Sequence, residues 1–220
     1  DHYTFRHSQN VAHYASELAK VAGLEKDLQE IVREASLLHD IGNPPFGHFG
    51  ETVIREWFRA NMSKLELKGQ KLTQWLTPQM QNDFYHFEGN TQALRLVGKL
   101  HYLIDEHGMN LTTALLGTII KYPVSSLEVN KDSGDIHTKK MGYYYAERDL
   151  FAQIQESLGT NGRRHPLAFL LEAADDIAYK TADMEDAFKK GCITYERLLE
   201  ELRKGGEGEP EDGEYFALIS

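Results

Sequence analysis

The sequence predicts an all-α protein, a helical bundle built around a single metal site. Apolar residues recur at the three- and four-residue spacing of an amphipathic helix along most of the chain. No convincing stretch alternates apolar and polar residues in the way that a half-buried strand requires. A histidine followed directly by an aspartate, His39-Asp40, stands where one predicted helix ends, and such a pair offers two ligands to a divalent metal.

The first two predicted helices lead to this pair. Apolar spacing predicts a helix over 8–21, with Ser8 as its N-cap and Gly23 at its end. A second helix, over 28–38, delivers His39-Asp40 at its C-terminal turn. The same spacing predicts further helices at 51–61, 88–104, 110–121, 146–158, 166–190 and 194–204.

Polar segments separate these helices and suggest the domain organisation. Residues 62–85 and 124–141 have no clear period, so we expect irregular insertions, with short helices as the alternative for the first. We therefore expect one core domain over 1–204. Residues 205–220 are expected to be a linker and the start of a further C-terminal region. The chain does not begin with Met, and we expect it to be a piece of a longer protein.

Composition narrows the class of protein. The 220 residues are 41% hydrophobic and 26% charged, enough for a sizeable core. The net charge of −10 argues against nonspecific binding to nucleic acid or anionic membranes, but is compatible with a polyphosphate ligand held by a few cations. No apolar run approaches the length of a membrane span. The single cysteine fits a reducing compartment, so we expect a cytoplasmic protein.

The segment after His39-Asp40 has the composition of a rigid loop. We expect Gly42 to stop the preceding helix in the left-handed conformation that helix ends often adopt, and Pro44 and Pro45 to stiffen the exit. A second histidine, His48, follows between two glycines. One more histidine and one more carboxylate would complete a metal site with room for water or substrate.

His7 is the candidate for the missing histidine. It begins a helix whose apolar face should pack against the helix that carries His39, which would bring both rings near one ion. Spacing alone leaves two interpretations of these histidines open, metal ligands or core histidines satisfied by hydrogen bonds.

Asp175 is the candidate for the missing carboxylate. It lies among apolar residues in the predicted helix over 166–190, where an uncompensated carboxylate would be costly to bury and a metal would compensate it. Tyr179 and Asp183 follow at spacings of four and eight, on roughly the same side of that helix. The alternative interpretation is a solvated acidic face.

The combination of His7, His39-Asp40 and Asp175 resembles the HD-domain metal-dependent phosphohydrolases. Within that group the chain resembles the deoxyguanosine triphosphate triphosphohydrolases of the wider dNTP triphosphohydrolase family. The motifs that carry this closer resemblance are Leu38-His-Asp-Ile-Gly-Asn-Pro-Pro-Phe-Gly-His-Phe-Gly-Glu51, His86-Phe-Glu-Gly-Asn90, Lys121-Tyr122, Lys139-Lys-Met-Gly-Tyr-Tyr144 and Glu172-Ala-Ala-Asp-Asp-Ile-Ala-Tyr179. The resemblance runs from His7 to about Asp186, without the family's C-terminal part.

The resemblance implies a role for each matching residue. His7, His39, Asp40 and Asp175 would hold one divalent ion, typically Mg²⁺ or Mn²⁺. The implied catalytic residues are His48, Glu51 and His86, with His48 and Glu51 as a pair. The implied substrate-binding residues are Asn43, Lys121, Tyr122, Lys140, Tyr179 and Asp183.

The implied activity is hydrolysis of dGTP, or of other dNTPs, to the deoxynucleoside and inorganic triphosphate by attack of water at the α-phosphorus. Metal and lysine charge would stabilise the transition state, and His48 beside Glu51 would protonate the leaving oxygen. Two alternatives stay open: an HD-domain nucleotidase or phosphodiesterase, and a non-catalytic dNTP-sensing module. Family members form tetramers or hexamers, so we also expect a homo-oligomer.

Overall fold

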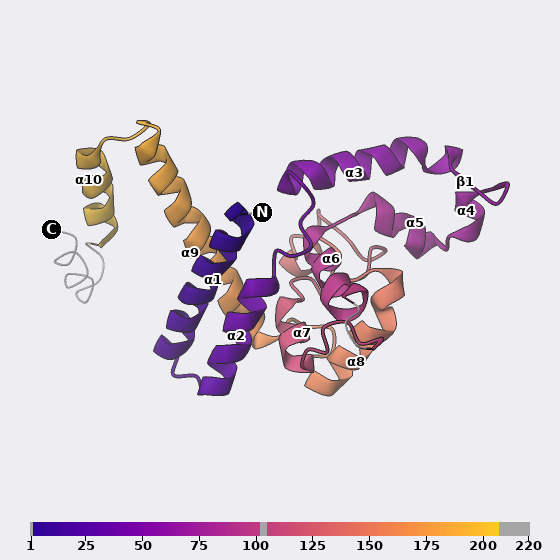
Figure 1. Ribbon diagram of the computed structural model, residues 1–220, viewed down its shortest axis with the longest axis horizontal. Helices are drawn as coiled ribbons and strands as arrows, with labels where there is room; N and C mark the ends of the chain where they lie inside the picture. Colours follow the sequence, from indigo (N-terminus) through magenta and orange to yellow (C-terminus); the bar gives the residue numbers. More distant parts are fainter. Residues whose placement is uncertain (1, 102–104, 207–220) are drawn as a thin grey trace. The chain divides into compact units, whose positions relative to one another are not determined.

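The computed structural model describes residues 2–101 and 105–206, and these are mostly helical (Figure 1). The prediction of an all-α fold is confirmed. The α-helices of the described residues are α1 (His2–Val21), α2 (Lys26–Leu38), α3 (Gly47–Asn61), α4 (Leu72–Trp75), α5 (Pro78–Tyr85), α6 (Gly89–Arg95), α7 (Thr113–Ile119), α8 (Arg148–Leu158), α9 (Pro166–Lys189) and α10 (Tyr195–Gly206).

Two very short strands were not predicted. β1 (Glu66–Leu67) and β2 (Gln70–Lys71) pair antiparallel as a hairpin within the segment expected to be irregular. Lys68 and Gly69, the two residues of its turn, both have positive φ, which is the backbone geometry of the tightest hairpin turns. The hairpin is too short for alternation to be read from the sequence.

The chain forms two compact units, Asp1–Asp176 and Ile177–Ser220, and the boundary falls inside α9. In the first unit α1 packs along α2, α2 contacts α7, and α7 contacts α8. α3 packs on α5 in the same unit. The core of the first unit is apolar and includes Val11, Ala15, Val32, Ala35, Met62, Leu94, Val97, Met141, Ile154 and Ala174.

Several predicted helix boundaries are wrong. α1 begins at His2, so Ser8 is a buried residue inside the helix and not its N-cap. The helix predicted over 88–104 is α6 followed by a π-helical turn, Leu96–Leu100, and the rest of it (102–104) lies outside the described residues. Apolar periodicity persists through such a change of winding, which is why the sequence pattern did not reveal it.

Gly42 has a different role from the one predicted. It is not among the residues with positive φ, and left-handed conformations occur instead at Phe46 and Gly47, just before α3. A Cβ on Gly42 would lie 2.1 Å from the Gly89 carbonyl oxygen and 2.2 Å from the Ala93 nitrogen. Glycine is therefore required here because α6 approaches the backbone closely.

The two predicted insertions differ in regularity. Residues 62–85 contain the hairpin, α4 and α5, and Thr77 caps α5 by accepting from the Met80 nitrogen. Residues 124–141 are mainly loop, with one short 3₁₀ turn, Ile136–Thr138. The predicted linker falls partly in α10, and 207–220 lie outside the described residues. Of the helices in 2–101 and 105–206, none combines the length and apolarity needed to cross a membrane.

Candidate active site

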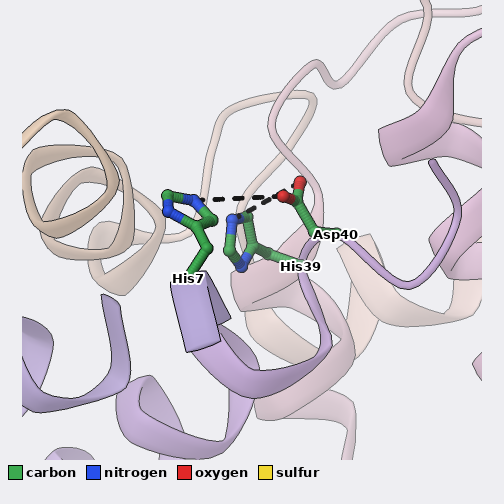
Figure 2. A group of neighbouring side chains, drawn as sticks. All are labelled: His7, His39 and Asp40. Carbon is green, nitrogen blue, oxygen red and sulfur yellow. Dashed lines mark ion pairs between the residues drawn. The ribbon is translucent and has the colours of Figure 1, made fainter. Parts of the chain in front are cut away.

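Packing of α1 against α2 brings His7 to the end of α2, where His39 and Asp40 lie (Figure 2). One side-chain nitrogen or oxygen from each of these three residues lies within 4.8 Å of the other two. His7 Nε2 is 3.9 Å from Asp40 Oδ2, and His39 Nε2 is 3.5 Å from Asp40 Oδ1. Two imidazoles and a carboxylate therefore face one small volume.

Asp175 joins this group from the part of α9 that belongs to the first unit. Its Oδ1 lies 3.0 Å from His7 Nε2 and 3.7 Å from His39 Nε2. The structure thus brings together the four residues expected around the metal, from three separate segments of the chain. Burial of the neighbouring Ala174, which belongs to the same unit, holds this part of α9 against the core of that unit.

The chemistry of the group fits a divalent cation. His39 Nδ1 lies 2.7 Å from the Ser36 carbonyl oxygen, so Nδ1 carries the hydrogen and the Nε2 lone pair faces the carboxylates. Within the described residues this buried Nε2 has no hydrogen-bond partner. A buried polar atom without a partner is costly, and coordination would satisfy it.

The pKa values of Asp175 and His39 are both shifted by their neighbours in this group. Burial by itself would raise the pKa of Asp175, but the facing imidazoles of His39 and His7 outweigh it and hold the pKa well below its usual range. Burial would lower the pKa of His39, but Asp175 and Asp40 outweigh it and raise the pKa. The negative charge of Asp40 and Asp175 favours a bound proton, and it would favour a bound metal ion for the same reason.

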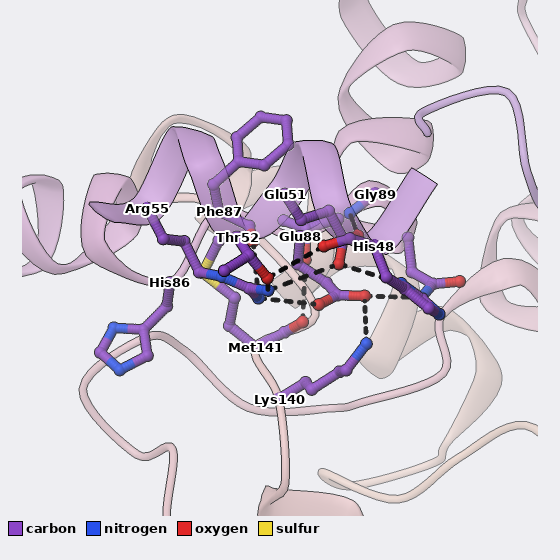
Figure 3. Close-up of polar contacts among 12 residues, drawn as sticks. His48, Glu51, Thr52, Arg55, His86, Phe87, Glu88, Gly89, Lys140 and Met141 are labelled. Atoms are coloured by element: carbon purple, nitrogen blue, oxygen red, sulfur yellow. Dashed lines mark hydrogen bonds and ion pairs between the residues drawn. The ribbon is translucent and has the colours of Figure 1, made fainter. Parts of the chain in front are cut away.

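His48 and Glu51 lie in hydrogen-bonding contact at the start of α3 (Figure 3). His48 Nδ1 is 3.1 Å from Glu51 Oε2. The imidazole is 82% exposed and the glutamate side chain 2% exposed, so the histidine meets solvent while its partner is buried. The Gly89 N–H donates to Glu51 Oε1 at 2.8 Å and fixes the other carboxylate oxygen.

Glu88 and Arg55, which sequence reasoning missed, surround this pair (Figure 3). Glu88 is 1% exposed, and its Oε1 accepts from Lys140 Nζ at 2.8 Å and from Asn90 Nδ2 at 2.9 Å. Arg55 Nη2 lies 3.7 Å from Glu51 Oε2. The i,i+4 spacing of Glu51 and Arg55 is a helix-pair signal that the sequence does contain.

Lys121 and Tyr122 lie in a second cluster of charge. Lys121 Nζ is 3.2 Å from Glu172 Oε1, and the buried Arg164 donates to Glu172 Oε2 at 2.6 Å. Arg164 also donates to the Lys121 carbonyl oxygen, and its guanidinium lies 5.5 Å from the centroid of the Tyr122 ring. Burial raises the pKa of Tyr122, so the phenol stays neutral. Arg164 was also missed by sequence reasoning.

The remaining predicted site residues are Asn43, His86, Tyr179 and Asp183. Asn43 lies three residues after Asp40, and its N–H donates to the Asp40 carbonyl oxygen at 3.1 Å. His86 Nδ1 faces the Asn82 carbonyl of its own helix at 3.1 Å, and its ring stands apart from the His48–Glu51 pair in Figure 3. Tyr179 and Asp183 lie on α9 in the second unit, where both side chains are exposed.

A mostly helical fold in which two histidines and two aspartates lie close together fits the class of helical proteins that bind a divalent metal. The sequence profile of the HD domain matches residues 4–116, and the chain belongs to the HD domain family. It is 56% identical over 172 residues to proteins of Listeria monocytogenes and Listeria innocua, each named deoxyguanosinetriphosphate triphosphohydrolase-like protein. It is 38% identical over 221 aligned positions to the deoxyguanosinetriphosphate triphosphohydrolase of Klebsiella pneumoniae.

Each alignment covers a larger share of this chain than of the relative. The alignments include 78% of this chain with the Listeria proteins and 90% with the Klebsiella protein. They include 37% and 42% of those relatives, respectively. The chain therefore spans well under half the length of the curated relatives that it matches.

Proposed function

We propose that this chain carries the catalytic centre of a metal-dependent hydrolase acting on dGTP, and on dNTPs as the wider substrate class. The products are the deoxynucleoside and inorganic triphosphate. The proposal rests on the convergence of His7, His39, Asp40 and Asp175 around the buried Nε2 of His39, which has no hydrogen-bond partner among the residues that the structure describes. The names of the Listeria and Klebsiella relatives support the choice of substrate.

The metal in this proposal is Mg²⁺ or Mn²⁺, held by His7, His39, Asp40 and Asp175. Imidazole and carboxylate ligands suit a hard or borderline divalent ion. When bound, such an ion polarises a phosphoryl oxygen and brings a water molecule to the α-phosphorus.

His48 is the general acid of the proposed reaction. Water adds to the α-phosphorus, the bond from that phosphorus to the 5′-oxygen breaks, and His48 gives the departing oxygen its proton. Glu51 orients the imidazole through the 3.1 Å contact to Nδ1, which leaves Nε2 of the exposed ring to face the substrate. His86 is proposed as a further catalytic residue near the phosphates.

Lys121 and Lys140 are proposed to bind the phosphates, and their surroundings support this role. Each lysine pairs with a glutamate, and each glutamate has a second cation nearby. Glu172 has Arg164 and Glu88 has Arg55, so a lysine could turn to a phosphate without leaving its carboxylate unpaired. Asn43, Tyr122, Tyr179 and Asp183 complete the proposed substrate-binding set.

The extent of the catalytic core, the compartment and the oligomeric state are also part of the proposed function. We assign residues 1–204 to the catalytic core. The protein is proposed to be a cytoplasmic homo-oligomer, a tetramer or hexamer, on the basis of its resemblance to the dNTP triphosphohydrolases and of its single cysteine.

Product analysis tests the function. The full chain is incubated with each of the four dNTPs and with GTP, in Mn²⁺ or Mg²⁺, and the inorganic products are separated. Triphosphate from dGTP supports the proposal, and loss of turnover with a chelator supports the metal. Orthophosphate or pyrophosphate as the product would indicate an HD-domain nucleotidase or phosphodiesterase instead. Nucleotide binding without any product would indicate a sensing module.

A further inference from the structure

Arg55 lies between two buried carboxylates on the inner side of α3 (Figure 3). Its Nη2 is 3.7 Å from Glu51 Oε2, and its Nη1 is 3.8 Å from Glu88 Oε2. The guanidinium is also held in place, because Nη1 donates to the Phe87 carbonyl oxygen at 3.3 Å and Nη2 to Thr52 Oγ1 at 3.2 Å. Arg55 is therefore fixed between the glutamates.

Glu51 needs a permanent positive neighbour. A carboxylate that is 2% exposed is costly to keep ionised unless it is paired. His48 is not a lasting partner in the proposed reaction, because as the general acid it gives up its proton and with it the positive charge of its ring. Arginine keeps its charge at all relevant pH values. Arg55 is thus the constant counter-charge of Glu51.

Glu88 shares the same arginine. Its Oε1 pairs with Lys140 and Asn90, whereas its buried Oε2 has no hydrogen-bond partner in the part of the chain that the structure describes. Arg55 is the cation that faces this Oε2. The charged groups facing Glu51 from the elements around it are thus His48 and Arg55 on α3, with Glu88 and Lys140 behind them.

We infer that Arg55 is a positioning residue that pairs with Glu51 and keeps its side chain directed at His48 throughout turnover. This inference rests on the proposed function of His48 as the acid. When the 5′-oxygen takes the proton of His48, Glu51 loses the attraction of the imidazolium, and Arg55 remains as its charged partner. His48, which is exposed, then regains its proton from solvent with its ring still held at Nδ1.

Substitution of Arg55 tests the inference against a matched control. Arg59 lies one turn further along α3 and also donates to a backbone carbonyl, that of Tyr85 at 2.6 Å. Arg55→Gln is expected to lower kcat about 10- to 100-fold with KM changed less than about twofold, as for loss of a charged contact that acts in the transition state. Arg55→Lys should recover part of kcat, and Arg59→Gln should retain it.

A double-variant cycle shows whether Arg55 acts through Glu51. If it does, Glu51→Gln removes the group that Arg55 holds, and adding Arg55→Gln should change kcat by less than about twofold further. Losses that multiply would overturn the inference, because the two residues would then act independently. A folded Arg55→Gln variant with wild-type kcat would overturn it as well.

Amide hydrogen exchange at Gly89 gives a readout that does not depend on activity. The Gly89 N–H donates to Glu51 Oε1, so a Glu51 that loses its counter-charge should protect this amide less. Arg55→Gln is expected to lower the protection of Gly89 about tenfold, and Arg59→Gln to leave it unchanged. Lowered protection in a chain that hydrolyses no dNTP would refute the proposed function but retain the positioning of Glu51. Unchanged protection would refute the positioning.

Discussion

His7 Nε2 lies 3.0 Å from Asp175 Oδ1, although 168 positions separate the two residues in the chain. This contact joins α1 to α9 at the point where α2 presents His39 and Asp40. The residues of this group come from three separate segments, and an ion bound among them would couple these segments. Metal binding is therefore expected to stabilise the fold as well as to support chemistry.

Removal of His7 should weaken metal binding. His7→Ala in the full chain is expected to lower the affinity for Mn²⁺ at least about tenfold, a loss that even residues outside the ligand set produce at metal sites. Titration calorimetry on chelator-treated protein measures it. His13→Ala is the control, because His13 is exposed on the same helix. Equal Mn²⁺ affinity in the two variants would contradict the assignment of His7.

Removal of His48 should separate catalysis from binding. His48→Ala is expected to lower kcat for dGTP by about 10²- to 10⁴-fold, the usual contribution of a general acid. Nucleotide affinity, measured by equilibrium binding, should change little because the His48 ring contacts Glu51 and His48 is not one of the four proposed metal ligands. Turnover that survives this substitution would show that another group supplies the proton.

Gly42→Ala should be strongly destabilising. The added methyl group would lie 2.1 Å from the Gly89 carbonyl oxygen, so α6 would have to move. We expect the free energy of unfolding to fall by about 3 kcal/mol, the upper part of the range for overpacking. Gly134→Ala is the control: a methyl group there meets open space, and its positive φ costs about 1 kcal/mol. Urea unfolding measures both, and equal losses would contradict the close approach.

Glu147 should give the fold a pH dependence that is independent of the metal group. Burial raises the pKa of Glu147, and Arg95 and Lys99 reduce this effect without cancelling it. The folded chain therefore holds this proton more tightly than the unfolded chain, and its contribution to stability falls as pH rises from the ordinary value of 4.5 through the raised pKa.

Comparison with Glu147→Gln isolates this contribution, because the amide does not titrate. The free energy of unfolding of the wild-type chain minus that of Glu147→Gln should decrease as pH rises through this interval and then become constant. Urea unfolding at a series of pH values measures the difference. A difference that is constant throughout, or that grows with pH, would contradict the assignment.

The helices that carry the site were predictable because their signals are local. Apolar spacing located α2 and the long α9, and the glycine at position 23, with φ of +69°, ends α1 as expected. The hydrogen bond from His39 to Ser36 is likewise local, since it spans one helical turn. The order of the motifs carried the resemblance to the HD domain family, which the comparison of the sequence with that family confirmed.

By itself the sequence determined the all-α class, most of the helices and the residue types available for a metal. Tertiary structure decided which of these residues meet: it joined Asp175 to His7, required glycine at position 42, and enclosed Glu51 and Glu88 around Arg55. The physical reason is the distance along the chain over which each kind of interaction acts. Helix periodicity depends on residues that are near one another in the sequence, whereas close backbone approach and the pairing of buried charges depend on how distant segments pack.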